Sequence, residues 1–208
     1  MNIAVLVSGG GTNLQALIDY EMSHADCPYH IGIVIADTKK AFALERAKKA
    51  GIATKIVSPV ALLGVEGARA ASKEAKREAV SNAALAAARE AGADAIVLAG
   101  WLTVLSGSII SEYSGRIVNL HPALLPKFGG VGMWGHFVHE AVLAARESES
   151  GCTVHLVDAG CDTGKILVQK KVPVMPDDTP DTLYARIAPH EHEAMVEGVC
   201  LLAEMLGK

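Results

Sequence analysis

The chain has 208 residues, half of them hydrophobic, which is enough to bury the core of one large domain or of two small ones. Its formal net charge is −4 and its lysines and arginines are dispersed, so a nucleic-acid partner is not expected. No apolar stretch approaches the roughly 20 residues that cross a bilayer, so a membrane partner is not expected either.

The first part of the chain alternates short apolar runs with segments of helical periodicity. The first run ends at three consecutive glycines, Gly9 to Gly11, and a helical pattern begins directly after them. The alternation then continues, with strands predicted at 2–8, 30–37 and 54–58 and helices at 12–20 and 41–51. Such alternation indicates a parallel sheet that is covered by helices.

The middle of the chain continues this pattern. An Ala-rich stretch with lysines and arginines on one side predicts one long helix over 67–91, and a strand at 94–101 follows it. Beyond that strand we expect a short helix at 107–113, a strand at 116–120 and, after a long loop, a helix at 136–146.

The last third of the chain has a different character. Two strand-like runs, 152–158 and 165–174, are joined by AGCDTG, which indicates a hairpin or two strands at a sheet edge. One or two helices are expected over 179–207. Because we find no internal repeat or linker, the sequence predicts a single α/β domain over 1–208. Its expected fold is a doubly wound, mostly parallel sheet with late antiparallel strands and a Rossmann-like N-terminal half.

The glycine turn after the first strand offers free backbone N–H groups at a helix N-terminus, which suits a phosphate. It is not a Walker A loop, because no lysine follows the glycines, and it is not GxGxxG, because Leu14 stands where the last glycine would be. A monophosphate held by backbone amides, the Thr12 hydroxyl and the Asn13 amide stays open. The alternative is a tight turn in which Thr12 caps the helix.

Asn119 and His121 stand one residue apart at the end of a predicted strand and before a proline-rich loop. Ligands of open parallel sheets lie beyond the carboxyl ends of the strands, so we expect this pair, the glycine turn and residues 101–105 to face one crevice. Asn119 can donate a hydrogen bond to a developing oxyanion, and His121 can move a proton. The alternative is a pair of turn residues that satisfy local backbone groups.

Asp162 lies in the loop between the two late strands. A carboxylate near an imidazole raises the pKa of the imidazole and fixes its orientation. A pairing of Asp162 with His121 is therefore a hypothesis, beside the alternative of an ordinary turn residue. No serine or cysteine stands in a nucleophile motif, so acid/base transfer without a covalent enzyme intermediate is favoured.

The remaining histidines and the cysteines do not predict a metal site. His136 and His139 are three residues apart on a predicted helix, and His190 and His192 flank Glu191. Neither group matches HExxH, and exposed or capping histidines are the commoner outcome. Glu191 is either a carboxylate that binds a ligand or a solvated residue at a helix start. The four cysteines show no metal-binding spacing, which indicates reduced thiols and a cytoplasmic protein.

The chain resembles the phosphoribosylglycinamide formyltransferases, the glycinamide ribonucleotide (GAR) transformylases of purine synthesis. Four segments carry the resemblance in the same order: SGGGTNLQAL, VLAGWLTVLS, NLHPALLPKFGG and SGCTVHLVDAGCDTGKILVQ. The resemblance implies a formyltransferase-type doubly wound α/β fold that passes a formyl group from 10-formyltetrahydrofolate to the primary amine of GAR. It further implies a phosphate-binding half at about 1–100, a folate-binding and catalytic half at about 101–208, no metal, and a monomer or homodimer.

The resemblance also implies roles for individual residues. Catalysis would fall to Asn119, His121 and Asp162, which hold the oxyanion and move the proton as N10 of the folate leaves. GAR would be bound by Gly11, Thr12, Asn13 and Glu191. Folate would be bound by Arg77, Leu102, Thr103, Val104, Leu105, Asn119, Asp158, Ala159, Gly160, Cys161 and Asp162.

Two features depart from the common family pattern. The segment that begins at Phe128 is longer than usual, so Met133, Trp134 and His136 take no role from the resemblance. Thr103 stands where many members carry a basic residue. Two other interpretations stay open, a formyltetrahydrofolate hydrolase-like enzyme and a non-catalytic nucleotide-binding regulatory module whose glycine turn holds an effector.

Overall fold

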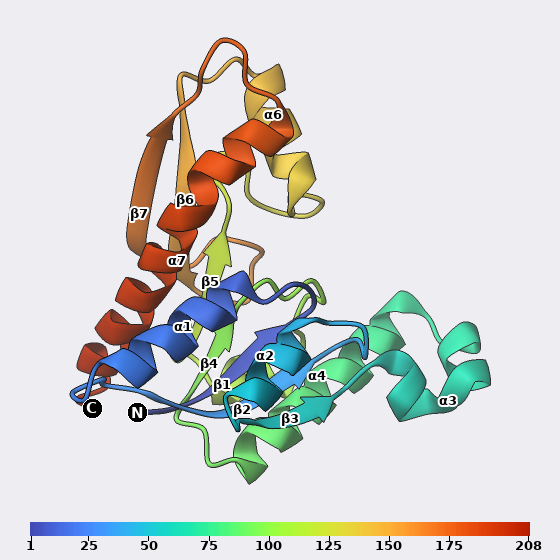
Figure 1. Cartoon of the computed structure of the whole chain (residues 1–208). Coiled ribbons are helices and arrows are strands. Elements are labelled where there is room, and N and C mark those ends of the chain that lie inside the picture. The colour runs from blue at the N-terminus through green and yellow to red at the C-terminus, as the bar shows by residue number, and fades with distance from the viewer.

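The computed structural model describes residues 1–208 and contains one seven-stranded sheet covered by helices (Figure 1). The strands are β1 (Asn2–Val7), β2 (His30–Ala36), β3 (Ala53–Ile56), β4 (Ala95–Leu98), β5 (Ile117–His121), β6 (Glu149–Leu156) and β7 (Ile166–Pro173). The helices are α1 (Thr12–Ser23), α2 (Ala43–Lys49), α3 (Pro59–Ala70), α4 (Lys73–Glu90), α5 (Ser108–Glu112), α6 (His136–Ala144) and α7 (Pro180–Met205).

The sheet has the strand order β3-β2-β1-β4-β5-β6-β7. The first five strands are parallel, whereas β6 pairs antiparallel with β5, and β7 pairs antiparallel with β6. The predicted class, a doubly wound and mostly parallel sheet with late antiparallel strands, is confirmed. The last two strands were expected to form either a hairpin or the edge of the sheet. They do both, because β6 and β7 form a hairpin that lies at the sheet edge.

The helices differ from the prediction between strands β3 and β4. The stretch 67–91 is not one helix, because the chain leaves the helical conformation before Ser72, whose side chain accepts a hydrogen bond from the Ala75 N–H and begins α4. A separate helix, α3, precedes it and begins after a second capping serine, Ser58. The alanine-rich composition favours helix on both sides of the break between α3 and α4, and only the capping residue Ser72 marks the break in the sequence.

Two hydrophobic cores lie on opposite faces of the sheet, because successive side chains of a strand point to opposite sides. Along β1, the residues Ile3, Val5 and Val7 belong to the larger core with α1 and α7. Ala4 and Leu6 belong to the smaller core with α4 and α5. This strand is therefore apolar without alternation, as expected for a strand that is covered on both faces.

Helix α7 packs against β6, and the contact is tight at Gly198. A Cβ atom built on Gly198 would lie 2.5 Å from Cγ1 of Val154 on β6. The helix begins at a capping box formed by Thr179 and Thr182 and runs as a single helix, with Pro189 inside it. This close approach fixes the antiparallel edge of the sheet against α7.

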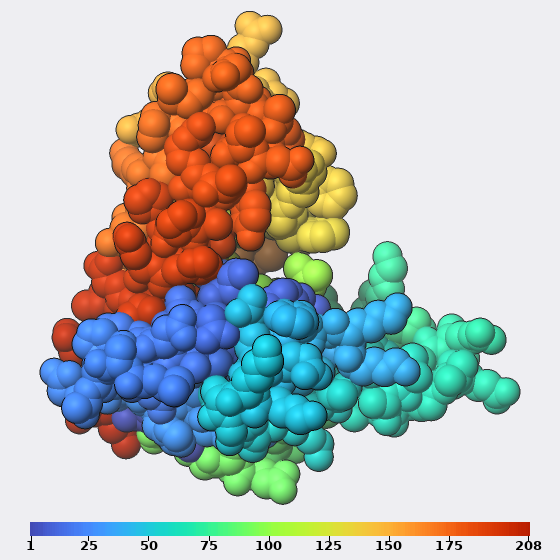
Figure 2. Space-filling model, in the orientation of Figure 1, coloured from blue at the N-terminus to red at the C-terminus, as the bar shows by residue number.

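The carboxyl ends of β1, β4 and β5 point toward one edge of the sheet, next to the N-terminus of α1 (Figure 1). Figure 2 shows the surface hollowed at this place, between the region of α6 and upper α7, in yellow and orange, and the region of α1 and α2, in blue and cyan. The residues that the sequence singled out follow these strands. None of the helices combines the length and the hydropathy of a membrane span.

We predict that Gly198→Ala lowers the free energy of unfolding by about 1–3 kcal/mol, although glycine to alanine in an open helix is stabilising. The added methyl group collides with Val154, whose β-branched side chain has little freedom to rotate away. Urea unfolding measures the effect. In a Val154→Ala background, Gly198→Ala should lower the free energy of unfolding by less. A Gly198→Ala protein that is as stable as the wild type would show that the contact between Gly198 and Val154 is not tight.

Candidate active site

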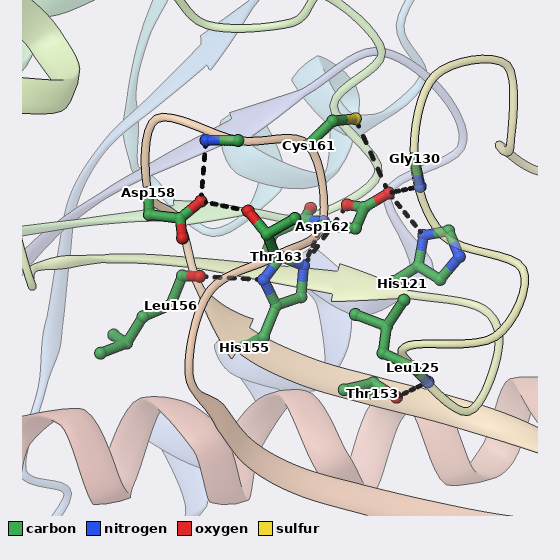
Figure 3. A network of polar contacts seen from close by, with 12 residues as sticks. His121, Leu125, Gly130, Thr153, His155, Leu156, Asp158, Cys161, Asp162 and Thr163 are labelled. Carbon is green, nitrogen blue, oxygen red and sulfur yellow. Dashed lines mark hydrogen bonds and ion pairs between the residues drawn. The ribbon is translucent and has the colours of Figure 1, made fainter.

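Asn119 and His121 lie at the end of β5, and β6 fixes both from the side. The antiparallel register places Asn119 opposite His155 and His121 opposite Thr153. The Leu125 N–H donates to the Thr153 hydroxyl at 3.1 Å (Figure 3), and this hydroxyl donates to the carbonyl of Ala123 at 2.6 Å. Both bonds hold the proline-rich loop after His121 close to β6. The His121 side chain is thus held in a buried position, with only 3% of the residue exposed.

The hydrogen bonds of His121 identify which ring nitrogen is free to take up a proton. Its Nε2 lies 2.7 Å from the carbonyl oxygen of Phe128, which can only accept, so Nε2 carries a hydrogen and donates. Its Nδ1 lies 3.6 Å from Oδ2 of Asp162. Burial lowers the pKa of His121 below its ordinary value, while the Asp162 carboxylate and the Phe128 carbonyl oppose this effect. The free ring is neutral near pH 7, and Nδ1 is its proton acceptor.

Asp162 is the centre of the polar network drawn in Figure 3. Its Oδ2 accepts a hydrogen bond of 2.9 Å from the Gly130 N–H, and its Oδ1 lies 3.5 Å from Nε2 of His155. Burial raises the pKa of Asp162, but the contacts with His155, Gly130 and His121 outweigh burial and bring the pKa below its ordinary value. The carboxylate is therefore ionised beside two histidines. The structure brings Asn119, His121 and Asp162 together although the last is 41 residues beyond His121.

His155 belongs to the network but was missed in the sequence. Its Nδ1 donates to the carbonyl of Leu156 at 2.9 Å, and its Nε2 lies 3.1 Å from Nδ2 of Asn119 and 3.5 Å from Oδ1 of Asp162. His155 thus fixes the position of the Asn119 amide, and Nδ2 of Asn119 keeps an N–H for a ligand. The only signal in the sequence was a histidine within the strand-like run CTVHLVD. The pairing of β6 with β5 is what places this histidine beside Asn119.

The segment after Phe128 approaches Asp162 closely, and its glycines permit this. A Cβ on Gly129 would lie 2.5 Å from Cδ2 of Leu125 and 3.2 Å from Cβ of Asp162. Gly130 has a φ of 96°, a conformation that side chains disfavour, and it directs its N–H at the carboxylate. The glycines that begin the lengthened segment are thus part of the support of Asp162.

The glycine turn presents a helix N-terminus without a side-chain cap. Gly11 is the N-cap residue, with a φ of 71°, and no side chain bonds to the first turn of α1. Thr12 is the first helical residue, so the alternative that Thr12 caps the helix is wrong. The N–H groups of the turn and of the first helical turn point to an open end, and the Gly10 carbonyl is occupied by Nε of Arg46 at 2.8 Å. The turn can bind an anion.

Asn13 and Glu191 meet across the molecule, 178 residues apart, where Nδ2 of Asn13 donates to Oε2 of Glu191 at 3.4 Å. Glu191 lies inside α7 and is 6% exposed, so it is not a solvated residue at a helix start. Burial raises its pKa from an ordinary value of 4.5 to about 7, and the hydrogen bond from Asn13 only partly opposes this. Oδ1 of Asn13 is buried without any partner, which leaves it available to a ligand.

A cavity of about 700 Å³ lies between α5 and the end of β6. Four of the residues to which the resemblance gives a folate contact line it, namely Arg77, Leu105, Asp158 and Ala159. Leu102 and Val104 do not line it, and their exposed fractions of 57% and 49% place them on the open surface beside it. The structure therefore brings only part of the expected set around one cavity.

Other expected folate residues are engaged by the protein itself. The Thr103 hydroxyl donates to Oδ2 of Asp37 at 2.8 Å, which ties the end of β4 to the end of β2. Asp158 closes its own loop, because its Oδ1 accepts from the Gly160 N–H at 2.9 Å and from the Thr163 hydroxyl at 2.7 Å. Cys161 is half-buried, with Sγ 3.8 Å from the Asp162 carboxylate. The loop is thus preformed next to Asp162.

The other histidines fall outside any metal arrangement, because no group of three or more His, Cys, Asp or Glu side chains is placed to hold an ion. His136 is exposed, as expected, but His139 is buried, so the expectation of exposed or capping histidines is wrong there. The four cysteines, Cys27, Cys152, Cys161 and Cys200, are free thiols.

Comparison with known proteins shows which family the chain belongs to. A model of the formyl transferase family matches residues 1–199. The chain is 40% identical over 205 residues to the trifunctional purine biosynthetic protein adenosine-3 of Drosophila melanogaster, covering 96% of this chain but 14% of the fly protein. It is 36% identical over 192 residues to the phosphoribosylglycinamide formyltransferase of Escherichia coli, covering 92% of this chain and 82% of that protein. The chain thus spans a small part of the fly protein and most of the bacterial one.

Solved structures agree with the sequence comparisons. The glycinamide ribonucleotide transformylase 1 of Symbiobacterium toebii superposes with a TM-score of 0.85 at 35% identity, covering 98% of this chain and 88% of that chain. The phosphoribosylglycinamide formyltransferase of Brucella melitensis superposes with a TM-score of 0.81 at 39% identity, covering 97% of this chain and 95% of that chain. With a family match over nearly its whole length, the chain belongs to the formyl transferase family.

Proposed function

We propose that this protein transfers the formyl group of 10-formyltetrahydrofolate to the primary amine of N1-(5-phospho-D-ribosyl)glycinamide (GAR), giving formyl-GAR in purine biosynthesis. The observation that carries the proposal is the meeting of Asn119, His121 and Asp162 at the end of β5, in a chain that matches the formyl transferase family over residues 1–199. The relatives named for this reaction cover nearly all of the chain, which supports the same substrates here.

The acceptor would bind between the N-terminus of α1 and α7. Its phosphate would take the open N–H groups at Gly11, Thr12 and Asn13, where the positive end of the helix dipole favours an anion. Glu191 would accept from a hydroxyl or amine group of the acceptor, since it is buried beside Asn13 with one carboxylate oxygen uncommitted. These contacts would place the acceptor amine toward His121.

The folate would bind on the other side of the network, along the 700 Å³ cavity that Arg77, Leu105, Asp158 and Ala159 line. The cavity has the size and the mixed lining that a flat heteroaromatic ring needs. Leu102, Thr103, Val104 and the loop from Gly160 to Asp162 border the same region and complete the expected folate contacts. One domain would thus hold a phosphate site in its N-terminal half and a folate site in its C-terminal half.

In the reaction, the acceptor amine forms a bond with the formyl carbon, and the bond from that carbon to N10 of the folate breaks. The free N–H of Asn119 would stabilise the negative charge that develops on the formyl oxygen. His121 would take the amine proton on Nδ1, become a cation beside Asp162, and return the proton to the leaving nitrogen. Asp162 would act as the counter-ion of this imidazolium. We expect these small-molecule steps in a cytoplasmic monomer or homodimer.

Turnover with and without GAR tests the function. Purified protein with GAR and a 10-formylfolate should release deformylated folate, and release should require GAR. Equal loss of folate without GAR would favour a hydrolase, and binding of ligand without turnover would favour a regulatory module. Either result would contradict the proposed function.

We predict that His121→Ala lowers kcat by about 10²- to 10⁴-fold, because it removes the proton acceptor and the cation beside the oxyanion. The dissociation constant for GAR should change little, because the phosphate contacts lie on α1. Steady-state kinetics and equilibrium dialysis with GAR measure the two effects. His30→Ala, an exposed histidine on β2, is the matched control and should retain activity. A fully active His121→Ala protein would refute the assigned role.

From the raised pKa of Glu191 we predict that the stability of the protein falls as pH rises toward neutral. Its pKa in the folded chain, about 7, lies above the ordinary value of 4.5, so the folded state binds the proton more tightly than the unfolded state. The group's contribution is complete below pH 4.5 and is lost as pH rises through about 7, on the order of 3 kcal/mol in all. The Glu191→Gln variant stays neutral and should lack this decline.

Urea unfolding of wild type and Glu191→Gln between pH 4.5 and 8 measures the difference. Glu204→Gln, an exposed change on the same helix, is the control and should follow the wild-type profile. Identical pH profiles for wild type and Glu191→Gln would mean that Glu191 is ionised in the folded protein.

A further inference from the structure

His139, on the inner face of α6, is a buried polar side chain that the protein itself leaves unused. Only 2% of the residue is exposed, and its neighbours on the same face are the apolar residues Val138 and Val142. Its Nδ1 is buried without a hydrogen-bond partner. Native proteins pair nearly all buried polar groups, so a buried imidazole nitrogen without a partner calls for an explanation.

The position of His139 points to a ligand. Its ring lies 5.8 Å from that of Tyr184 on α7, centroid to centroid, and the two rings are tilted by 44°. Tyr184 lies two turns before Glu191 on the same helix, and burial, with a smaller contribution from Glu191, raises the pKa of Tyr184. His121 is close enough to contribute to lowering the pKa of His139. His139 therefore has Tyr184 of α7 and His121 of β5 as neighbours, and its helix, α6, borders the hollow seen in Figure 2.

The protonation state of His139 limits the group that it can bind. Burial, with smaller contributions from His136 and His121, lowers the pKa of His139 to about 4. The ring is neutral at physiological pH and offers one N–H donor and one lone pair. Such a ring suits a neutral group that both donates and accepts, a hydroxyl or an amide, and does not suit a phosphate, which the N-terminus of α1 already serves.

We propose that His139 is a substrate-binding residue that hydrogen-bonds a neutral hydroxyl or amide group of the acceptor, in the part between its phosphate and its amine. The assignment rests on the proposed function, because the phosphate at α1 and the amine at His121 define that part. The buried Nδ1 of His139 then gains a hydrogen-bond partner only when the acceptor is bound, and it stays unpaired in the free protein.

His139→Leu separates this role from a structural one. If the ring is unpaired in the free protein, leucine removes a buried polar group and the midpoint of urea unfolding stays equal or rises. The same change should raise KM for GAR at least tenfold and leave KM for the folate within twofold. His139→Gln, which restores a donor and an acceptor, should recover part of the KM for GAR.

Ser150→Ala is the matched control, because Ser150 is also 2% exposed with an unpaired hydroxyl, but it lies on β6 beside a different, smaller cavity. It should leave both KM values unchanged. A KM for GAR within twofold of wild type in His139→Leu overturns the assignment, whatever its stability. If His139→Leu is both less stable and higher in KM, recovery of KM by glutamine supports the assignment, and no recovery overturns it.

The failure of this inference is distinguishable from that of the proposed function. A wild-type protein that shows no GAR-dependent transfer refutes the function before any variant is compared. A wild-type protein that transfers formyl to GAR while His139→Leu keeps its KM refutes only the role of His139.

Discussion

The antiparallel pairing of β6 with β5 is the constraint on which the site depends. The pairing sets Asn119 opposite His155, beside the amide, and it ends β6 at Leu156, opposite Val118. The loop that follows β6 then carries Asp162 to His121. A parallel sixth strand would have needed another crossover helix first. The tight contact between Gly198 and Val154 holds this edge in place from the helix side.

Burial then sets the charges of the groups that the pairing brings together. His121 and Glu191 both favour their neutral forms, whereas Asp162 stays ionised because two histidines and the Gly130 N–H surround it. The site therefore holds one fixed negative charge beside one imidazole that is ready to accept a proton. Separating the protonation states of neighbouring groups in this way is how a single fold performs acid/base chemistry near neutral pH.

The strands were predictable because they are apolar runs with clear ends, and the βα alternation fixed the parallel part of the sheet. The break between α3 and α4 was not predicted, since both sides of it have high helix propensity and only Ser72 marks it. The pairing of Asp162 with His121 stood only as a hypothesis, and His139 was expected at the surface. Neither relation could be read from spacing, because each depends on which distant element packs on β5 and α7.

By itself, the sequence determined the alternation of strands and helices, the glycine turn before α1, and the polar pair at the end of β5, because all three are local patterns of residue type. The tertiary structure alone decided that Asp162 and His155 reach Asn119 and His121, that Asn13 meets Glu191, and that His139 is buried without a partner. These relations join residues far apart in the chain, and they are set by strand register and helix packing, which local composition does not encode.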